Sequence, residues 1–199
     1  MQARSPTYDR ILEAASAHFA ERGYDGSSLT HIASAVGIRK PSLYAHFANK
    51  NALYMEVFKQ ALQQECAMVA RCFDEEGGVA TPGAGYADSL IARHASNEPL
   101  HFLLRTSYTP PAELRVAIDE GHERYLDLLH DTFCAKLRAC VQAANLDDAA
   151  ISQYGQAYVG IIDSLQVKLV YTDREQAAAR WAVMQRLLAD ALEHATSKE

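Results

Sequence analysis

A short stretch in the first quarter of the chain concentrates side chains that can donate hydrogen bonds to an anion or a base. These donors are the guanidinium, ammonium, hydroxyl and imidazole groups of Arg39, Lys40, Ser42, Tyr44 and His46. Such groups bind phosphate oxygens and the base edges of nucleic acids. Leu43 and Phe47 are four residues apart, so in a helix they share one face and leave the polar groups pointing outward. The pattern indicates a nucleic-acid-binding surface on a short helix.

Further candidate phosphate contacts lie before and after this stretch. Ser27, Ser28 and Thr30 begin the preceding predicted helix, where hydroxyls and free backbone N–H groups can hold a phosphate. Lys50 begins the following helix and offers another cation. The full set of candidate DNA contacts is Ser27, Ser28, Thr30, Arg39, Lys40, Pro41, Ser42, Tyr44, His46 and Lys50. The alternative for each is a solvated side chain, and for Tyr44 it is a half-buried tyrosine that only packs.

Two short helices joined at a glycine are expected to position these side chains. The first has an apolar stripe made of Leu29, Ile32, Ala33 and Val36. Gly37 follows it and is free to take the positive φ of a tight turn, and Pro41 then suits the start of the second helix. Helix, glycine turn and helix form the helix-turn-helix pattern. We expect the pair to share a core with Ile11, Leu12 and Phe19; the alternative is a chance packing of three helices.

Helical periodicity continues along the rest of the chain, and no period-two strand pattern occurs. A first helix is expected from Ser5-Pro6 to a stop at Gly23, and Asn49 can cap a long helix over about 50–73. Glycine and proline at 77–85, and Pro110-Pro111, mark breaks. Further helices are expected over about 86–95, 99–107, 112–144, 148–171 and 175–195. The sequence therefore predicts an all-α protein.

The net charge of −6 would argue against nucleic-acid binding if it were spread evenly. It is not: residues 1–60 carry seven Lys/Arg and five Asp/Glu, whereas the remainder carries 12 and 20. A basic N-terminal region on an acidic chain can turn one face toward a polyanion. The charge distribution is therefore compatible with DNA binding.

The cysteines and the hydropathy exclude several other classes of protein. Cys66, Cys72, Cys134 and Cys140 form no C-x-x-C pair and have no histidine at zinc-finger spacing. We expect buried, reduced thiols, with redox or metal sensing as the alternatives. Residues 1–10 are polar, and no run of about 18 apolar residues occurs, so neither a secretory signal nor a membrane span is expected. A cytoplasmic location follows as an expectation.

The two motifs resemble those of the TetR family of repressors. Residues 23–33 match the family's first signature, and residues 36–47, followed by Asn49-Lys50 and Leu53, match the second. The resemblance covers residues 7–60 in detail; beyond them the chain agrees only in length and helix number. Two positions depart from the pattern. Arg39 stands where many members have serine, which adds charge but loses a helix cap, and Asn51 stands where many have an acid.

The resemblance implies an all-α fold of about nine helices. It implies a three-helix, homeodomain-like helix-turn-helix domain at 1–50 and a helical ligand-binding and dimerisation domain at 51–199, with the helix over about 50–73 as the connector. The last two helices would pair with their copies in a homodimer. No catalytic residue, metal site or cofactor is expected.

Candidate effector contacts in the C-terminal domain combine aromatic surface with polar anchors. They are His101, Phe102, Arg105, Tyr108, His122, Tyr125, Tyr158 and Asp163. Ligand pockets are mostly apolar with a few placed polar groups, so we expect a small, partly aromatic or acyl organic effector. The alternative at each aromatic position is ordinary core packing.

The apolar stripes of the last two predicted helices exceed what one small core needs. The residues expected at a dimer interface are Tyr154, Ile161, Leu165, Trp181, Met184 and Leu188. Gly155 and Gly160 would let helices approach closely. The alternative is packing within one chain.

The prediction is a DNA-binding transcriptional regulator: a repressor released from a palindromic double-stranded operator by a small-molecule effector. In a dimer, two recognition helices would lie in successive major grooves about 34 Å apart, and the connector helix would swing when ligand binds. One alternative is an activator, or a ligand-independent DNA-binding protein, with the same N-terminal domain. A helical-bundle enzyme is another, but His101, His122 and Asp163 show no nucleophile–base spacing.

Overall fold

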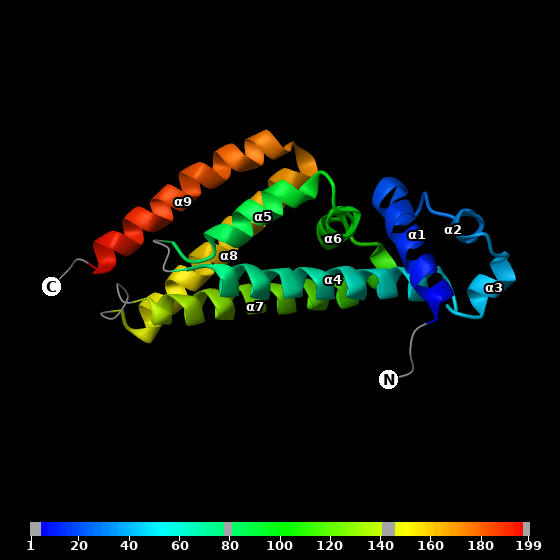
Figure 1. Cartoon of the computed structure of the whole chain (residues 1–199), viewed down its shortest axis with the longest axis horizontal. Coiled ribbons are helices and arrows are strands. Elements are labelled where there is room, and N and C mark those ends of the chain that lie inside the picture. The colour runs from blue at the N-terminus through cyan, green and yellow to red at the C-terminus, as the bar shows by residue number, and fades with distance from the viewer. Residues whose placement is uncertain (1–4, 78–80, 141–145, 197–199) are drawn as a thin grey trace. The chain divides into compact units, whose positions relative to one another are not determined.

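The computed structural model describes residues 5–77, 81–140 and 146–196, and in these ranges the chain is helical with no strand (Figure 1). The all-α prediction is confirmed. The elements are α1 (Pro6–Arg22), α2 (Leu29–Val36), α3 (Lys40–Tyr44), α4 (Lys50–Glu75), α5 (Ala84–His94), α6 (Glu98–Tyr108), the 3-10 turn η1 (Ala112–Leu114), α7 (Arg115–Ala139), α8 (Asp148–Tyr171) and α9 (Arg174–Thr196).

The ends of the first helices are set by side-chain caps and by glycines, as the sequence predicts. The Ser5 hydroxyl accepts from the Tyr8 N–H, and the Ser28 hydroxyl accepts from the Thr30 N–H. Gly23 and Gly37 end α1 and α2 with φ of +68° and +76°, a region that side chains disfavour. Local sequence therefore fixes where the helices of the N-terminal region begin and end.

The helix expected over about 112–144 differs from the prediction at its start. Residues 112–114 form the 3-10 turn η1, in which the Leu114 N–H donates to the Pro111 carbonyl, and α7 begins only at Arg115. The two prolines lack N–H donors, so they delay the α-helical hydrogen bonds. α7 ends at Ala139, and the expected continuation through 141–144 lies outside the described residues.

The chain divides into two compact units. The first unit contains the residues up to Gln63 together with Asn97–Gly121, and the second contains Gln64–Ser96 and His122–Glu199. The division falls inside α4 and inside α7, and it places α6 in the first unit. A functional boundary at residue 50 stays a prediction.

The core of the first unit joins α1 to α6 through aromatic rings. The Phe19 ring lies 4.7 Å from that of Tyr54, which in turn lies 5.0 Å from Phe102. Tyr54 and Thr106 share a hydrogen bond of 2.7 Å between their hydroxyls. Arg105 donates to the Ala20 carbonyl at 3.1 Å, where a cation complements the C-terminal end of α1. α6 is thus part of the same core as the helix-turn-helix.

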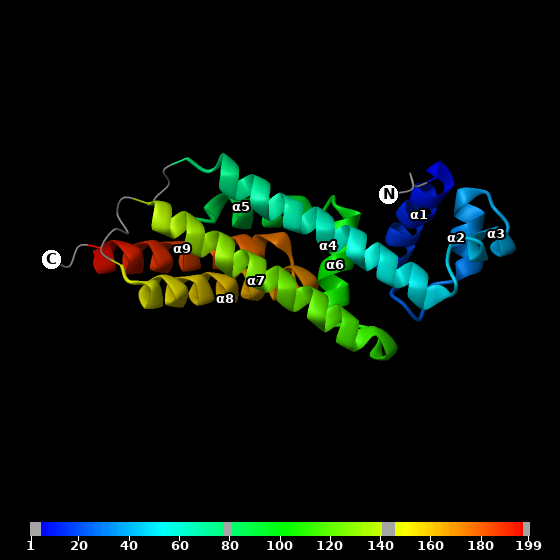
Figure 2. The ribbon, with the colours of Figure 1, turned by 90° about the horizontal axis from the view of Figure 1, so that it is seen from below.

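The second unit is built around α8 and α9, which lie side by side (Figure 2). Tyr158 of α8 is fully buried, stacks on Phe133 at 4.6 Å and donates its hydroxyl to the Gly83 carbonyl at 2.8 Å. Trp181 of α9 donates its indole N–H to Asp88 Oδ1 at 2.8 Å. Each buried aromatic that carries a polar atom therefore has a partner for it, as burial requires.

Replacement of Gly83 by alanine should destabilise the second unit. Its φ is +79°, and an added Cβ would lie 2.4 Å from Tyr158 Cζ, so backbone strain and overpacking act together. We expect Gly83→Ala to lower the free energy of unfolding, measured by urea denaturation, by about 2–4 kcal/mol. Gly77→Ala is the control, since nothing lies within 4 Å of its added Cβ. Equal stability of the two variants would contradict the packing described for Gly83.

Candidate nucleic-acid interface and effector site

α3 presents an exposed polar face that is held by two buried anchors. Leu43 within this five-residue helix is fully buried, and Phe47 just beyond its C-terminal end is 5% exposed, so both tie the helix to the core. Tyr44 is 46% exposed, and the Lys40 ammonium lies 5.9 Å from the centre of its ring. The predicted contact residues that share this exposed surface are Arg39, Lys40, Pro41, Ser42, Tyr44 and His46. The surface has the cations and hydroxyls that DNA recognition requires.

The turn that carries α3 is rigidly bonded to α2. The Gly37 N–H donates to the Ser34 carbonyl, and the Ile38 N–H reaches back to the Ala33 carbonyl at 3.0 Å. Arg10 of α1 donates to the Val36 carbonyl at 2.7 Å, which places a cation at the C-terminal end of α2. Ile38 is half-buried and packs against the core. The second helix of the motif is therefore fixed in place by backbone bonds and by α1.

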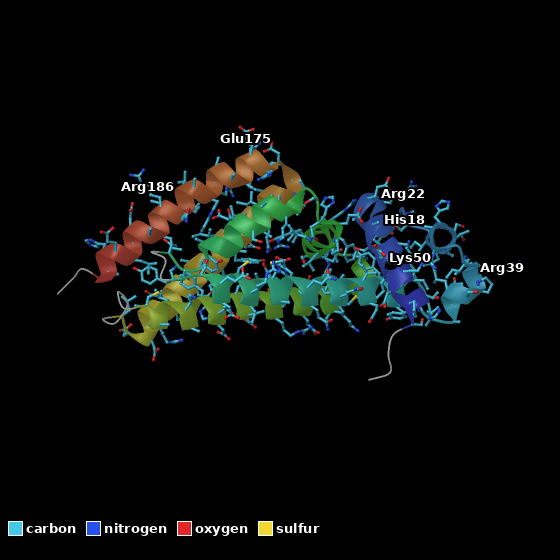
Figure 3. The ribbon with its side chains drawn as sticks, in the orientation of Figure 1. His18, Arg22, Arg39, Lys50, Glu175 and Arg186 are labelled. Atoms are coloured by element: carbon cyan, nitrogen blue, oxygen red, sulfur yellow. The ribbon has the colours of Figure 1, made fainter. Side chains whose placement is uncertain are left out.

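Arg39 is the N-cap residue of α3 and makes no side-chain cap bond. The loss of a cap at this position, expected from the sequence, is confirmed. Its guanidinium projects from the end of the first unit that carries α3 (Figure 3). A residue that gives up a cap for a cation on an exposed face is better suited to an external anion than to folding.

The three hydroxyl residues at the start of α2 differ in their surroundings. Ser27 is buried and donates its hydroxyl to the Gly23 carbonyl at 2.6 Å, so its proton is used inside the domain. Ser28 caps α2, and Thr30 is exposed. Phosphate contact by these residues stays a prediction, and the geometry favours Thr30 over Ser27.

Lys50 is the first residue of α4 and is held beside an aromatic ring. Its ammonium lies 4.2 Å from the centre of the Tyr24 ring, a cation–π distance. The Tyr24 hydroxyl donates to Asn51 Oδ1, and Asn51 Nδ2 donates to Glu113 Oε2. Asn49 accepts from the Ala52 N–H at 2.9 Å and caps α4, as expected. The Lys50 charge is thus oriented without being neutralised by a carboxylate in direct contact.

A buried polar network occupies the second unit and was not predicted from the sequence. Arg93 makes a two-pronged ion pair with Glu65, with N–O distances of 2.8 and 3.0 Å, and Glu65 is only 3% exposed. Tyr86 donates its hydroxyl to Glu65 Oε1 at 2.7 Å and shares a 2.6 Å bond with the Tyr125 hydroxyl. Gln166 donates to Tyr125 at 2.6 Å. The network joins α4, α5, α7 and α8.

The donors in this network point in one direction. Because Tyr86 gives its only hydroxyl proton to Glu65, Tyr125 must donate to Tyr86, and Gln166 donates to Tyr125. Burial raises the pKa of both phenols, that of Tyr86 well above its ordinary value. Both hydroxyls therefore remain protonated near neutral pH. This series of hydrogen bonds ends at the Glu65 carboxylate, which fixes the orientation of every donor before it.

The predicted effector contacts fall into two sets. Tyr125, Tyr158, His122 and Asp163 belong to the second unit, where Tyr125 and Tyr158 are buried and the His122 ring lies 5.8 Å from Tyr125. Residues His101, Phe102, Arg105 and Tyr108 belong instead to the first unit. There Phe102 packs on Tyr54 and Arg105 binds α1 carbonyls, so both have structural roles. The effector role of all eight stays a prediction.

The sequence did not predict the residues of this network, although one signal was available. They are Glu65, Tyr86, Arg93 and Gln166. Glu65 lies on the stripe that includes Ala61, Val69 and Phe73, at four-residue spacing. An acid on a buried helical stripe needs a partner, because an unpaired buried charge is costly. Arg93 supplies that partner from a helix 28 residues away in sequence, which periodicity does not reveal.

Half of the expected dimer residues are buried within one chain. Leu165, Trp181 and Leu188 are buried in the second unit, whereas Tyr154, Ile161 and Met184 are half-buried. The Tyr154 hydroxyl donates to the Ala191 carbonyl at 3.0 Å, joining α8 to α9. Apolar side chains left exposed on α9 are Val183 and Leu187, each 59% exposed and one turn apart. They were not among the predicted interface residues.

The four cysteine side chains are buried or half-buried. All four cysteines are unpaired, and burial raises the pKa of Cys66, Cys72 and Cys134, which disfavours the reactive thiolate. Among the described residues, no three His, Cys, Asp or Glu side chains are grouped so that they hold a metal ion. In the same part of the chain, none of the helices has the length and apolar character to cross a bilayer.

Residues 11–57 match the family model described as bacterial regulatory proteins, tetR family. They include most of α1, all of α2 and α3, and the start of α4. A negative transcriptional regulator of the icaADBC biofilm operon, IcaR of Staphylococcus aureus (strain Newman), is 45% identical over 51 residues. The IcaR of Staphylococcus epidermidis is 46% identical over 46 residues. These matches span only 27% and 25% of the relatives' own lengths, and 26% and 23% of this chain.

Solved structures share the fold over almost the whole chain. FadR of Bacillus halodurans, a fatty acid degradation regulator, has a TM-score of 0.71 at 23% identity, covering 94% of this chain and 97% of its own. SCO4454 of Streptomyces coelicolor, a TetR-family transcriptional regulator, has a TM-score of 0.72 at 16% identity, with 94% and 96% covered. AibR, in complex with isovaleryl coenzyme A and operator DNA, has a TM-score of 0.64 at 20% identity, with 92% and 98% covered.

Removal of one partner of the buried Arg93–Glu65 ion pair should destabilise the second unit, because the other partner then loses its counter-charge. Glu65→Ala leaves the Arg93 guanidinium without its carboxylate, and we expect a loss of about 3 kcal/mol in the free energy of unfolding. Glu75→Ala on the same helix is the control, because the Arg71–Glu75 pair is exposed and should contribute less than about 1 kcal/mol.

A paired replacement separates the charge from the packing. Glu65→Leu combined with Arg93→Met removes both charges, and we expect it to recover most of the stability that Glu65→Ala loses. Equal destabilisation by Glu65→Ala and Glu75→Ala in urea denaturation would contradict the burial and pairing described for Glu65.

Proposed function

We propose that this chain, whose N-terminal domain belongs to the tetR family of bacterial regulatory proteins, is a transcriptional repressor that an organic effector releases from a palindromic operator. One observation carries the proposal. The exposed face of α3 gathers cations and hydroxyls, is anchored by Leu43 and Phe47, and lies inside the region that matches the family model. The IcaR relatives, named negative regulators, favour repression over activation.

The residues of α3 divide into base-reading and phosphate-binding groups. Lys40, Ser42 and Tyr44 lie on the exposed face of the helix and are proposed to reach base edges in the major groove. Arg39 at the N-cap of α3, Thr30 in the first turn of α2 and Lys50 at the start of α4 are proposed to bind phosphates, which fix the position of the domain on the duplex. Base contacts then determine sequence preference, and phosphate contacts determine the dependence of affinity on salt.

A second copy of the chain is the proposed partner of α9. Val183 and Leu187 leave an apolar stripe exposed on a helix that already packs on α8, and burial of such a stripe favours association. The exposed Gly160 and Ala157 on α8 would allow close approach of another helix. A homodimer places two copies of α3 on a two-fold axis, which matches a palindromic operator.

The second unit is the proposed effector site. Tyr86, Tyr125 and Gln166 form directional polar groups beside the stacked rings of Phe133 and Tyr158, a combination of apolar surface and few polar anchors that suits an organic ligand. The neighbour AibR is described with isovaleryl coenzyme A, and FadR of Bacillus subtilis with stearoyl-CoA. An acyl compound is therefore the first effector class to test.

Effector binding would lower operator affinity by its preference for one of two conformations. α4 contributes residues to both units and begins at Lys50, so it is the proposed connector between them. The binding free energy to the operator that is lost equals the difference between the effector's binding free energies to the DNA-competent conformation and to the conformation that does not bind DNA.

Removal of the α3 side chains should abolish specific DNA binding. We expect Lys40→Ala combined with Tyr44→Ala to weaken binding to a DNA duplex taken from the region upstream of the protein's own gene. The expected loss is roughly 1–3 kcal/mol per lost base contact. Fluorescence anisotropy at fixed salt measures this. Lys59→Ala, an exposed cation on α4, is the charge-matched control and should bind normally. Unchanged affinity in the double variant would exclude α3 as the reading helix.

Introduction of a charge on α9 should separate the two copies. We expect Val183→Asp combined with Leu187→Asp to give a monomer in sedimentation velocity while the helical circular dichroism is retained. Val116→Asp is the control, because Val116 is 72% exposed on α7 in the first unit. A dimer that survives the α9 variant would place the interface elsewhere.

A further inference from the structure

Four basic side chains from three helices cluster where α1 ends and α2 begins, all within the first unit. His18 and Arg22 are one turn apart on α1, and both lie toward α2 (Figure 3). The His31 ring of α2 lies 6.0 Å from that of His18, edge to face. Lys50 begins α4 and lies close enough to His18 to affect its titration. None of the three α1 and α2 residues was among the predicted DNA contacts.

His18 is the central member of this cluster. Its Nε2 lies 3.4 Å from the Ser28 backbone nitrogen, so the neutral ring accepts from that N–H. Burial lowers the pKa of His18, and the charges of Arg22, His31 and Lys50 act in the same direction. Glu21 is the one acid among the groups that affect it. In the protein alone, the neutral ring is favoured.

The cluster disfavours a positive charge on His18. Arg22, His31 and Lys50 repel such a charge, and Glu21, which lies 3.7 Å from the Arg22 guanidinium, is 71% exposed and therefore a weak counter-charge. An anion placed among the four groups would relieve the repulsion. Thr30 precedes His31 in α2, Lys50 acts on His18, and both are proposed above as phosphate contacts, so the anion that best fits is a phosphodiester of the duplex.

We propose that His18, Arg22 and His31 bind a backbone phosphate of the DNA, and that His18 takes up a proton when they do so. This inference rests on the proposed DNA binding by the first unit. A protonated imidazole cannot accept from the Ser28 N–H, so the ring turns. A ring N–H of His18 and the freed Ser28 N–H then both donate to the phosphate. Proton uptake thus adds a charge and frees a backbone donor, and both changes strengthen phosphate binding.

The sign of the pH dependence follows from linkage. Phosphate binding raises the pKa of His18 above its lowered value in the free protein, so the complex holds more protons than its components. Affinity for DNA therefore rises as pH falls from the pKa in the complex to the pKa in the free protein. It is level with respect to His18 above and below that window. An increase of one pKa unit corresponds to about tenfold in affinity.

The test uses a mixed-sequence duplex of about 30 base pairs at low salt, because phosphate contacts do not depend on sequence. Anisotropy titrations at constant ionic strength from pH 8 to pH 5.5 compare the wild-type chain with His18→Asn, whose amide side chain cannot take up a proton. We expect affinity to rise about three- to tenfold more in the wild type than in His18→Asn. His194→Asn, an exposed histidine of α9, is the control.

The comparison with His18→Asn is needed because the first unit contains other histidines, among them His31 and His46. A residue-specific readout is the imidazole NMR titration of His18 with and without the duplex; its pKa should rise in the complex. Inorganic phosphate in place of DNA should produce a smaller rise. Arg22→Ala should reduce the slope of log affinity against log salt by about one.

The outcomes separate this inference from the proposed function. If the wild type binds DNA, Lys40→Ala with Tyr44→Ala weakens specific binding, and the pKa of His18 is the same with and without duplex, only the phosphate site is wrong. If the wild type does not bind duplex DNA at any pH, the proposed function fails as well. A wild-type pH dependence that His18→Asn retains in full overturns the role of His18.

Discussion

The burial of Leu43 and Phe47 is the constraint on which the exposed face of α3, the proposed DNA-binding surface, depends. α3 has five residues, and a helix of this length is unstable in water without tertiary packing. Leu43 in α3 and Phe47 just after it belong to a core that includes Ile11, Leu12 and Phe19 of α1. The exposed side chains, from Arg39 to His46, inherit their positions from these anchors. The recognition surface is therefore as rigid as the core beneath it.

The same core reaches beyond the helix-turn-helix. Phe19, Tyr54 and Phe102 link α1, α4 and α6, and Arg105 binds the C-terminal end of α1. Residues far apart in sequence thus belong to the unit that carries the DNA surface. In the second unit, Glu65 has a comparable organising role. Gln166 donates to Tyr125, Tyr125 donates to Tyr86, and Tyr86 donates to Glu65. One unit is arranged around apolar anchors and the other around a buried carboxylate.

Local patterns in the sequence were sufficient for the helices and for the exposed face of α3. Ser5, Ser28, Gly23 and Gly37 act within four residues of their own positions, so their effects can be recognised without a fold. Long-range partners could not be. Glu65 lies on an apolar stripe, but its partner Arg93 follows from packing alone. Apolar periodicity likewise marks both buried and exposed stripes, so the buried Trp181 was expected at an interface, whereas Val183 and Leu187 are exposed.

The central claim is that the exposed face of α3 binds DNA, and amide NMR with a duplex of the chain's own upstream region tests it most directly. The account predicts that the largest changes in amide shift occur at residues 39–46 and near Lys50, with small changes around Tyr125. Shifts confined to the second unit, or none at saturating duplex, would contradict it.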